Sequence, residues 1–261
     1  MTGTEAVTWA MVAPGILQVD LHRSPANALG LPIVDGLAAA LDAADAAEDV
    51  RVVVVASDIA GFFAAGADIK LMATIDSAGF TEYGDKLRSA LGRLAAPGRL
   101  SVAAVEGLAL GGGLELAMAC TMRVAGANAK FGLPEVKIGL IPGAGGTQRL
   151  PRLVGRGRAL DIMLTARQVA APEAAEIGLV DRLVEPGSAL EAALALATEL
   201  IGASALAQAA VIRTVDAAFD LSLEEGIALE RFEVGDQFEN GDGREGLTAF
   251  IEKRPPEFGR R

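Results

Sequence analysis

The chain has 261 residues, of which 51% are hydrophobic and 22% charged, with a formal net charge of −11 at pH 7. This length and composition provide a sizeable buried core, and the acidic balance argues against nucleic acid as a partner, because phosphate backbones are bound by clustered lysines and arginines. The single histidine, His22, and the single cysteine, Cys120, exclude an intrachain disulfide framework and a His-Cys zinc site. A run of ~18 apolar residues is needed to span a bilayer and none occurs. The N-terminal residues lack the pattern of a signal peptide, so we expect a cytoplasmic protein.

Short apolar runs alternate with helical patterns over the first two-thirds of the chain, which is typical of an α/β fold. Strands are predicted at Ile16–Leu21, Arg51–Ala56, Ser101–Val105, Met122–Ala125 and Leu179–Val184. Apolar residues at helical spacing predict crossover helices at Leu31–Ala47 and Phe80–Leu94.

From about residue 188 the pattern changes to helices only. These are predicted at Ser188–Ile201, Ala205–Phe219, Leu223–Phe238 and Arg244–Lys253. We therefore expect a core region over residues 1–187 that contains the functional site, and a helical region over residues 188–261.

Two glutamates lie in short apolar stretches near the middle of the chain. Glu115 is flanked by Leu114 and Leu116, and Glu135 follows Leu133 and Pro134. Partial removal of a carboxyl group from water raises its pKa toward neutral pH, where it can donate or accept a proton. The pattern therefore predicts a proton-transfer pair.

Three consecutive glycines, Gly111 to Gly113, precede a run of helix formers that ends at Ala119. The free N–H groups of a helix start can approach a developing negative charge, particularly where no side chain intervenes. This predicts an oxyanion site beside Glu115. The alternative is that the glycines only allow this helix to pack closely and that Glu115 caps its own first turn.

The glycine-rich segment Ile141–Gln148 superficially resembles a nucleotide-binding loop. It lacks the third glycine of the dinucleotide-binding pattern, because Gln148 stands at that position, and the chain has no Gly-Lys-Ser/Thr sequence. We expect these glycines to shape the turn after Glu135 and to open a helix at Gly146–Val154.

Four segments together resemble the enoyl-CoA hydratase/isomerase, or crotonase, family. They are Pro25-Ala-Asn-Ala-Leu29, Phe63-Ala-Ala-Gly-Ala-Asp-Ile69, Glu106-Gly-Leu-Ala-Leu-Gly-Gly-Gly-Leu-Glu-Leu116 and Phe131-Gly-Leu-Pro-Glu-Val-Lys-Ile-Gly-Leu-Ile-Pro-Gly-Ala-Gly-Gly-Thr-Gln148. The resemblance covers essentially the whole chain. It implies an α/β fold built as a spiral of ββα units, followed by C-terminal helices that form a trimer interface.

The resemblance also implies an activity. It indicates an enoyl-CoA hydratase, a lyase that adds water to a 2-trans-enoyl-CoA thioester to give a 3-hydroxyacyl-CoA, as in fatty-acid β-oxidation. In the family's pattern the backbone N–H groups of Ala67 and Gly112 form the oxyanion hole, and Glu115 and Glu135 transfer protons. No metal or redox cofactor is implied, since coenzyme A is part of the substrate. Two alternatives stay open: a Δ3-Δ2 enoyl-CoA isomerase, which needs one carboxylate, and a protein that binds acyl-CoA without turnover.

The same resemblance suggests which residues contact the ligand. The predicted substrate-binding residues are Arg23, Ala26, Ala65, Gly66, Ala67, Asp68, Ile69, Lys70, Gly112 and Lys253. Arg23 and Ala26 would lie near the nucleotide end of coenzyme A. Lys253, or the nearby Phe250, would reach the ligand of a neighbouring subunit in a homotrimer or a dimer of trimers. Lys253 could equally serve only as a favourable cation at a helix C-terminus.

Overall fold

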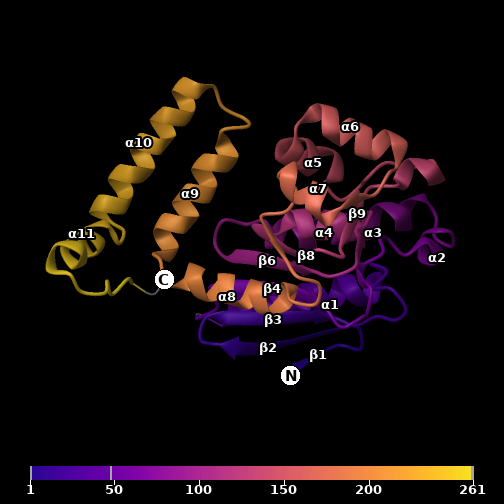
Figure 1. Cartoon of the computed structure of the whole chain (residues 1–261), viewed down its shortest axis with the longest axis horizontal. Coiled ribbons are helices and arrows are strands. Elements are labelled where there is room, and N and C mark those ends of the chain that lie inside the picture. Colours follow the sequence, from indigo (N-terminus) through magenta and orange to yellow (C-terminus); the bar gives the residue numbers. More distant parts are fainter. Residues whose placement is uncertain (1, 48, 260–261) are drawn as a thin grey trace. The chain divides into compact units, whose positions relative to one another are not determined.

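The computed structural model describes residues 2–47 and 49–259, which form two compact units of mixed α/β and all-α structure (Figure 1). The first unit comprises Met1–Ala96 with Leu100–Ala197, and the second comprises Pro97–Arg99 with Thr198–Arg261. The division falls inside helix α8 (Ala189–Ile201), whereas the sequence suggested a region boundary just before that helix begins.

A seven-stranded sheet forms the centre of the first unit. Its strand order is β1 (Thr2–Gly3), β2 (Val7–Ala13), β3 (Ile16–Leu21), β4 (Val52–Ser57), β6 (Leu100–Val105), β8 (Met122–Gly126) and β11 (Arg182–Val184). The strands from β3 to β11 pair in parallel, and β1 and β2 are antiparallel additions at one edge. The consecutive valines of β4 are all buried, as expected for a parallel strand that is covered on both faces.

A second sheet contains four very short strands. Its order is β10 (Val169–Ala170), β9 (Lys130–Gly132), β7 (Leu108–Leu110) and β5 (Phe62–Ala64). The sequence analysis did not predict these strands, because segments of two or three residues are too short to show a periodic pattern. Strands β5 and β7 each end directly before a segment of the predicted oxyanion hole.

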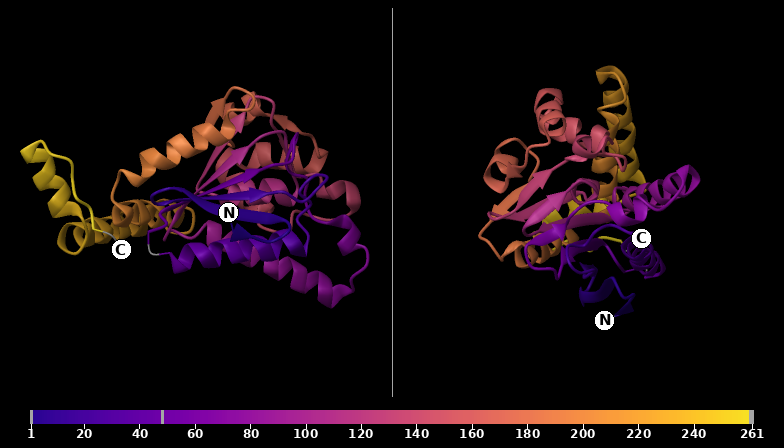
Figure 2. Two further views of the ribbon diagram at one scale, coloured as in Figure 1. Left: turned by 90° about the horizontal axis from the view of Figure 1, so that it is seen from below. Right: turned by 90° about the vertical axis from the view of Figure 1, so that its right-hand side faces the viewer.

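Helix α1 (Leu31–Ala46) covers one face of the large sheet, and α3 (Ser77–Leu94) packs beside it (Figure 2). Leu37 and Leu41 of α1 share one hydrophobic cluster with Val53 and Val55 of β4. The first unit also contains α2 (Ile69–Met72), α4 (Gly112–Ala119), the 3-10 helix η1 (Glu135–Ile138), α5 (Gly146–Val154), α6 (Arg156–Thr165) and α7 (Ala171–Glu176). Every residue of α4 is buried, so this helix is part of the core.

The second unit contains α9 (Ala205–Ala217), α10 (Leu223–Glu239) and α11 (Gly243–Glu252). Helix α10 begins with a capping box in which Ser222 and Glu225 satisfy each other's backbone N–H groups. An ion pair of 2.6 Å between Arg213 and Glu233 joins α9 to α10.

The predicted elements are confirmed with shifts of a few residues at their ends. The exception is the last predicted strand, which begins at Arg182 rather than Leu179, because Leu179 and Val180 lie in the buried turn after α7. Within the described ranges no single helix combines the length and apolar composition of a membrane span, although α8 and α9 pass that test together as a bent pair.

Candidate active site

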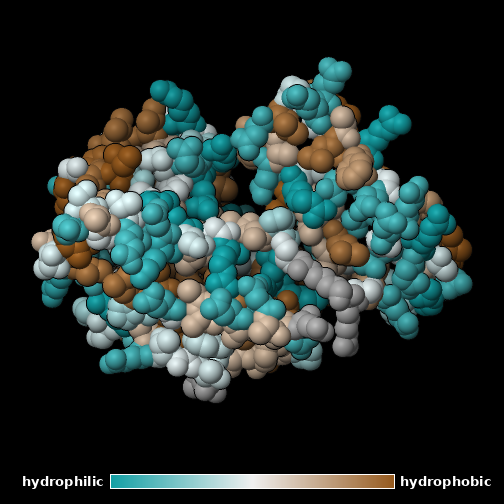
Figure 3. Space-filling view, turned by 180° about the vertical axis from the view of Figure 1, so that it is seen from behind, coloured by the Kyte–Doolittle hydropathy of each residue, from teal (hydrophilic) through white to brown (hydrophobic). Residues whose placement is uncertain are grey.

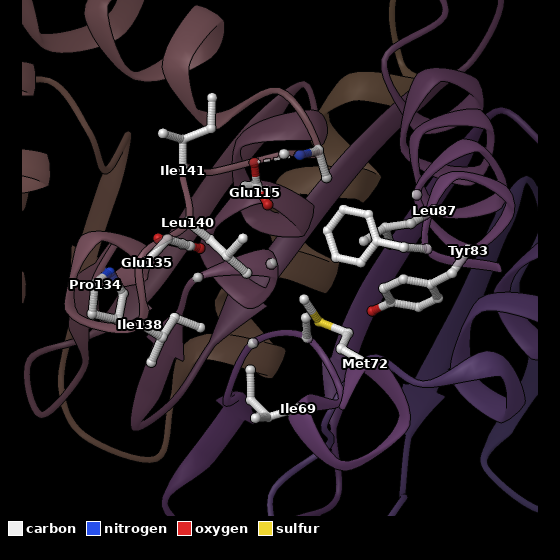
Figure 4. Close-up of a pocket in the computed structure, with 18 of the residues that line it drawn as sticks. Ile69, Met72, Tyr83, Leu87, Glu115, Pro134, Glu135, Ile138, Leu140 and Ile141 are labelled. Carbon is white, nitrogen blue, oxygen red and sulfur yellow. Dashed lines mark hydrogen bonds between the residues drawn. The ribbon is translucent and has the colours of Figure 1, made fainter. Parts of the chain in front are cut away.

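A cavity of about 310 Å³ lies in the first unit (Figure 4). Its apolar wall is formed largely by Ile69, Met72, Phe80, Tyr83, Leu87 and Leu140. The carboxyl groups of Glu115 and Glu135 point into it from different elements, α4 and η1. The cavity is therefore mainly hydrophobic with a small number of placed polar groups, which is the usual character of a small-molecule site.

Glu115 lies in the first turn of α4 and is only 3% exposed. Its Oε1 accepts hydrogen bonds from the N–H groups of Ala144 and Gly146, each at 2.7 Å. Burial raises the pKa of this carboxyl group, and the two N–H donors oppose that rise. The alternative that Glu115 caps its own helix is wrong, because the donors to its side chain, Ala144 and Gly146, lie at or just before the start of α5 and not in α4.

Glu135 is the first residue of η1, directly after Pro134. Its Oε2 is buried and accepts no hydrogen bond from the described part of the chain. Burial raises the pKa of Glu135 to about 7, and the nearby charge of Glu115 adds to that rise. A buried oxygen without a partner is costly, so this atom is poised to receive a water molecule or a substrate group.

The backbone N–H groups of Ala67 and Gly112 lie close together. A Cβ atom added to Gly112 would stand 3.5 Å from the nitrogen of Ala67. Gly112 is the first residue of α4, so its N–H has no intrahelical acceptor, and the neighbouring Gly111 has φ +51°. The two N–H groups therefore offer adjacent donors at the positive end of a helix.

Short backbone hydrogen bonds hold the Ala67 segment in place. Ala65 N–H donates to the carbonyl of Ala26 at 2.9 Å, and Leu29 N–H donates to the carbonyl of Gly66 at 2.8 Å. Leu29 and Ala67 form a parallel bridge. The motif after β3 and the motif after β5 thus meet in space, and this pairing positions the segment that carries the Ala67 N–H group.

The close-packing explanation for the three glycines holds for Gly113. A Cβ atom there would lie 2.1 Å from the carbonyl oxygen of Ala64, so only glycine fits. Gly111 serves the site itself, because a Cβ atom at that position would lie 2.8 Å from Oε1 of Glu135. The glycines therefore contribute both to packing and to access.

Asn27 is a residue to which the sequence analysis assigned no role. It is fully buried with φ +52°, and its Nδ2 donates to Oγ of Ser57 at 2.7 Å and to the carbonyl of Phe63 at 3.0 Å. Asparagine tolerates this left-handed backbone conformation better than most residues. Asn27 thereby fastens the loop after β3 to β4 and β5. The feature of the sequence that could have indicated this role is the position of Asn27 between two alanines in the segment Pro25-Ala-Asn-Ala-Leu29.

The predicted substrate-binding residues fall into three groups. Those that line the cavity are Ala65, Gly66, Ala67, Ile69 and Gly112. Four others belong to the first unit but do not line the cavity: Arg23, Ala26, Asp68 and Lys70. Lys253 belongs to the second unit, where it ends α11 with φ +57°.

Arg23 and Asp68 bind each other. The guanidinium of Arg23 contacts Oδ2 of Asp68 at 2.7 Å and the carbonyl of Ala28 at 2.7 Å. Asp68 also caps α2 by accepting a hydrogen bond from the N–H of Leu71 at 3.1 Å. This pair stabilises the loop that carries Ala67, so Asp68 has a structural role in that loop.

Cys120 is buried at the end of α4, and burial raises the pKa of its thiol to about 12. It is a core residue, as expected from its apolar neighbours in the sequence.

Residues 12–261 match the model of the family described as "Enoyl-CoA hydratase/isomerase". A Mycobacterium tuberculosis protein named "Probable enoyl-CoA hydratase echA8" is 42% identical over 241 residues, which cover 92% of this chain and 93% of that protein. The mitochondrial methylglutaconyl-CoA hydratase of Mus musculus is 37% identical over 249 residues, covering 94% of this chain and 79% of the relative.

Solved structures give the same result. The crystal structure of an enoyl-CoA hydratase from Bacillus anthracis superposes with a TM-score of 0.92 at 32% identity and covers 98% of this chain and 100% of its own. An enoyl-CoA hydratase subunit from Geobacillus kaustophilus has a TM-score of 0.90 at 38% identity, with both chains covered completely. The expected fold class, with its C-terminal helices, is confirmed by these similarities.

Proposed function

Because this chain belongs to the enoyl-CoA hydratase/isomerase family and is an enzyme of its hydratase type, we propose that it adds water to a 2-trans-enoyl-CoA thioester to give a 3-hydroxyacyl-CoA. The observation that carries the proposal is the pair of pocket carboxyl groups beside two adjacent backbone N–H donors. Both carboxyl groups have raised pKa values, through burial above all. A carboxyl group whose pKa is raised above its ordinary value is better suited to give and take protons during one reaction.

Addition of water to a conjugated thioester places negative charge on the thioester oxygen. The N–H groups of Ala67 and Gly112 would stabilise this charge, and one such donor is typically worth about 10²–10³ in rate. One of the two glutamates takes a proton from the water that bonds to C3, and the other delivers a proton to C2. All atoms of the product then come from the substrate, water and these transferred protons, so the proposal requires no metal or redox cofactor.

Two carboxyl groups in one pocket favour the hydratase over the Δ3-Δ2 isomerase, which moves a single proton with a single carboxylate. Glu115 and Glu135 approach from separate elements, and the charge of Glu115 contributes to the raised pKa of Glu135. Their convergence supports a reaction that uses both groups.

The ligand would enter along the segment that links β5 to α2. Ala65, Gly66, Ala67 and Ile69 line the cavity with small or apolar side chains, which leaves room for the pantetheine arm beside the main chain. Lys70 is exposed next to this segment and would meet phosphate groups outside the cavity. The proposed roles of Arg23 and Ala26 at the nucleotide end, and of Lys253 across a subunit boundary, follow the family pattern.

Turnover of crotonyl-CoA, measured as loss of the absorbance of its conjugated thioester, tests the proposal. We expect activity in the wild-type chain, and losses of about 10²–10⁴-fold in Glu115→Gln and in Glu135→Gln, because each change removes a titrating proton while it keeps size and hydrogen bonding. Glu176→Gln is the matched control, since Glu176 is an exposed glutamate of α7 in the same unit.

Near-normal rates in either pocket variant would remove that glutamate from the mechanism. Conversion of a 3-enoyl-CoA to the 2-enoyl-CoA without hydration would instead support the isomerase.

A further inference from the structure

Arg149 of α5 is a half-buried cation without an ion-pair partner among the described residues. Its Nη1 donates a hydrogen bond of 3.0 Å to the carbonyl oxygen of Ala144. Other arginines of the first unit, such as Arg93, Arg123 and Arg167, each contact a carboxylate within 2.8 Å. Partial burial of a guanidinium without a directly paired carboxylate is unfavourable. Another interaction must therefore offset the cost of burying Arg149.

The turn that Arg149 holds is the one that binds Glu115. The N–H groups of Ala144 and Gly146 both donate to Oε1 of Glu115 at 2.7 Å. Arg149 and the buried carboxylate therefore bind the same turn, Arg149 through a carbonyl oxygen and Glu115 through two N–H groups. Gly145 allows the arrangement, because a Cβ atom there would lie 2.1 Å from Nη1 of Arg149.

The opposite charges of Arg149 and Glu115 interact across the turn. Burial lowers the pKa of Arg149, and the charge of Glu115 opposes that change. Burial raises the pKa of Glu115, and the charge of Arg149 opposes that rise, together with the two N–H donors. The other charged or titratable groups coupled to Glu115 are Arg88 of α3, Tyr83 of α3 and Glu135 of η1.

A direct ion pair between Arg149 and Glu115 would affect the carboxylate differently from the observed arrangement. It would occupy the carboxylate oxygens and strongly favour the ionised form, which would hinder proton transfer. In the observed arrangement both hydrogen bonds fall on Oε1, while Oε2 accepts none from the chain within residues 2–47 and 49–259. One oxygen of Glu115 is thus fixed, and the other faces the cavity (Figure 4).

We propose that Arg149 is a positioning residue for Glu115, which holds the Ala144–Gly146 turn against Oε1 and stabilises the carboxylate by its charge across the turn while leaving Oε2 open to the cavity. This role deepens the proposed hydratase function and rests on it. Arg149 itself does not line the cavity, so it acts through Glu115 and not on the substrate.

The first experiment is the pH dependence of kcat/KM for crotonyl-CoA in Arg149→Gln, Arg149→Lys and Arg152→Gln. Loss of the positive charge in Arg149→Gln disfavours the ionised form of Glu115. We therefore expect the part of the pH profile that reflects ionisation of Glu115 to shift to higher pH by about one unit. Arg149→Lys keeps the charge, so its pH profile should match that of the wild type. Arg152 is an exposed arginine of the same helix, and its glutamine variant should match the wild type.

A purely structural role for Arg149 would lower the rate equally at all pH values. An unshifted profile in a folded Arg149→Gln variant would therefore overturn the proposal. If that variant does not fold, a shift of one unit in Arg149→Lys would overturn it as well, since the charge is present there.

A second experiment does not depend on turnover. In a double-mutant cycle at pH 8, Arg149→Gln should lower the Tm by about 2–4 °C more in the wild-type background than in the Glu115→Gln background. Glutamine keeps an acceptor for the Ala144 and Gly146 N–H groups, so the cycle isolates the charge. Equal losses in both backgrounds would refute the coupling, whereas failure of wild-type hydration alone would refute only the proposed function.

Discussion

Glu115 and Glu135 carry the same carboxyl group in different surroundings. Oε1 of Glu115 is fixed by two N–H donors, whereas Oε2 of Glu135 is buried without a partner in the described residues. Glu115 is therefore held in place by hydrogen bonds, whereas one carboxylate oxygen of Glu135 has no hydrogen-bond donor among the described residues. At the level of single residues, this difference is consistent with the proposal that two identical side chains perform two different proton transfers.

The buried, unpaired oxygen of Glu135 predicts that this carboxyl group lowers the stability of the folded protein when it is ionised. Its pKa is raised from 4.5 to about 7, so the folded state holds this proton more tightly than the unfolded state, and stability should fall as pH rises through this interval. Glu135→Gln removes the ionisation. We expect its Tm to exceed that of the wild type at pH 8, and the difference to shrink at pH 5, where the wild-type carboxyl is protonated.

Thermal unfolding followed by circular dichroism measures this effect, and about 1 kcal/mol corresponds to roughly 2–4 °C in a protein of this size. Glu176→Gln is again the control. A Tm difference that is the same at pH 5 and pH 8 would contradict the assignment of a raised pKa to Glu135.

At the level of elements, the start of α4 combines two requirements. Gly112 presents a backbone N–H group close to that of Ala67, while Gly113 permits contact between the helix and the backbone of β5. In the proposed mechanism the N–H of Gly112 acts only when charge develops on the substrate, whereas the contact made at Gly113 is part of the folded structure. Substitutions at these neighbouring glycines should therefore separate catalysis from packing.

We expect Gly112→Pro to lose about 10²-fold or more in kcat, because proline removes the N–H and is tolerated in the first turn of a helix. Gly112→Ala is the matched control. It keeps the N–H, and its Cβ would meet the flexible end of Leu29 at 3.2 Å. Gly113→Ala should instead lower the Tm, because its Cβ would overlap the Ala64 carbonyl.

Binding of a saturated acyl-CoA, measured by calorimetry, distinguishes the two effects. In a folded Gly112→Pro variant it should fall much less than kcat. An unchanged kcat would refute the oxyanion role of Gly112, and equal losses in binding and kcat would indicate a general distortion of the site.

At the level of the whole molecule, the second unit exposes large apolar side chains. Leu223, Phe232, Phe250 and Ile251 are 82%, 68%, 84% and 78% exposed. Hydrophobic side chains also reach the surface in the space-filling view (Figure 3). Since water-exposed apolar area of this extent commonly marks an association surface, it supports the proposed homotrimer or dimer of trimers.

Multi-angle light scattering should give a mass of three or six chains of 26.7 kDa each. Phe232→Asp should reduce this mass and lower the Tm, because it places a charge on the proposed contact surface. Leu164→Asp is the comparison, since Leu164 is 67% exposed in the first unit, and we expect it to leave the mass unchanged. A stable monomer of the wild-type chain at micromolar concentration would refute the assembly.

The sequence by itself determined most of the long elements, although it did not predict β2 or α6, and it singled out the two acids that line the cavity. Valine runs such as β4 and the helical spacing of α1 are local patterns, and local patterns are visible without a fold. The unusual setting of Glu115 and Glu135 was visible for the same reason, because a carboxyl group among apolar residues and glycines stands out in any sequence.

Only the tertiary structure decided how these parts meet. The short strands β5, β7 and β9 carry no periodic signal, yet they bring Ala67 to Gly112. The partners of Glu115 lie 29 and 31 residues further along the chain, and the charge that opposes its burial comes from Arg149 on α5. Contacts between residues so distant in sequence depend on the packing of whole elements, so no local pattern could specify them.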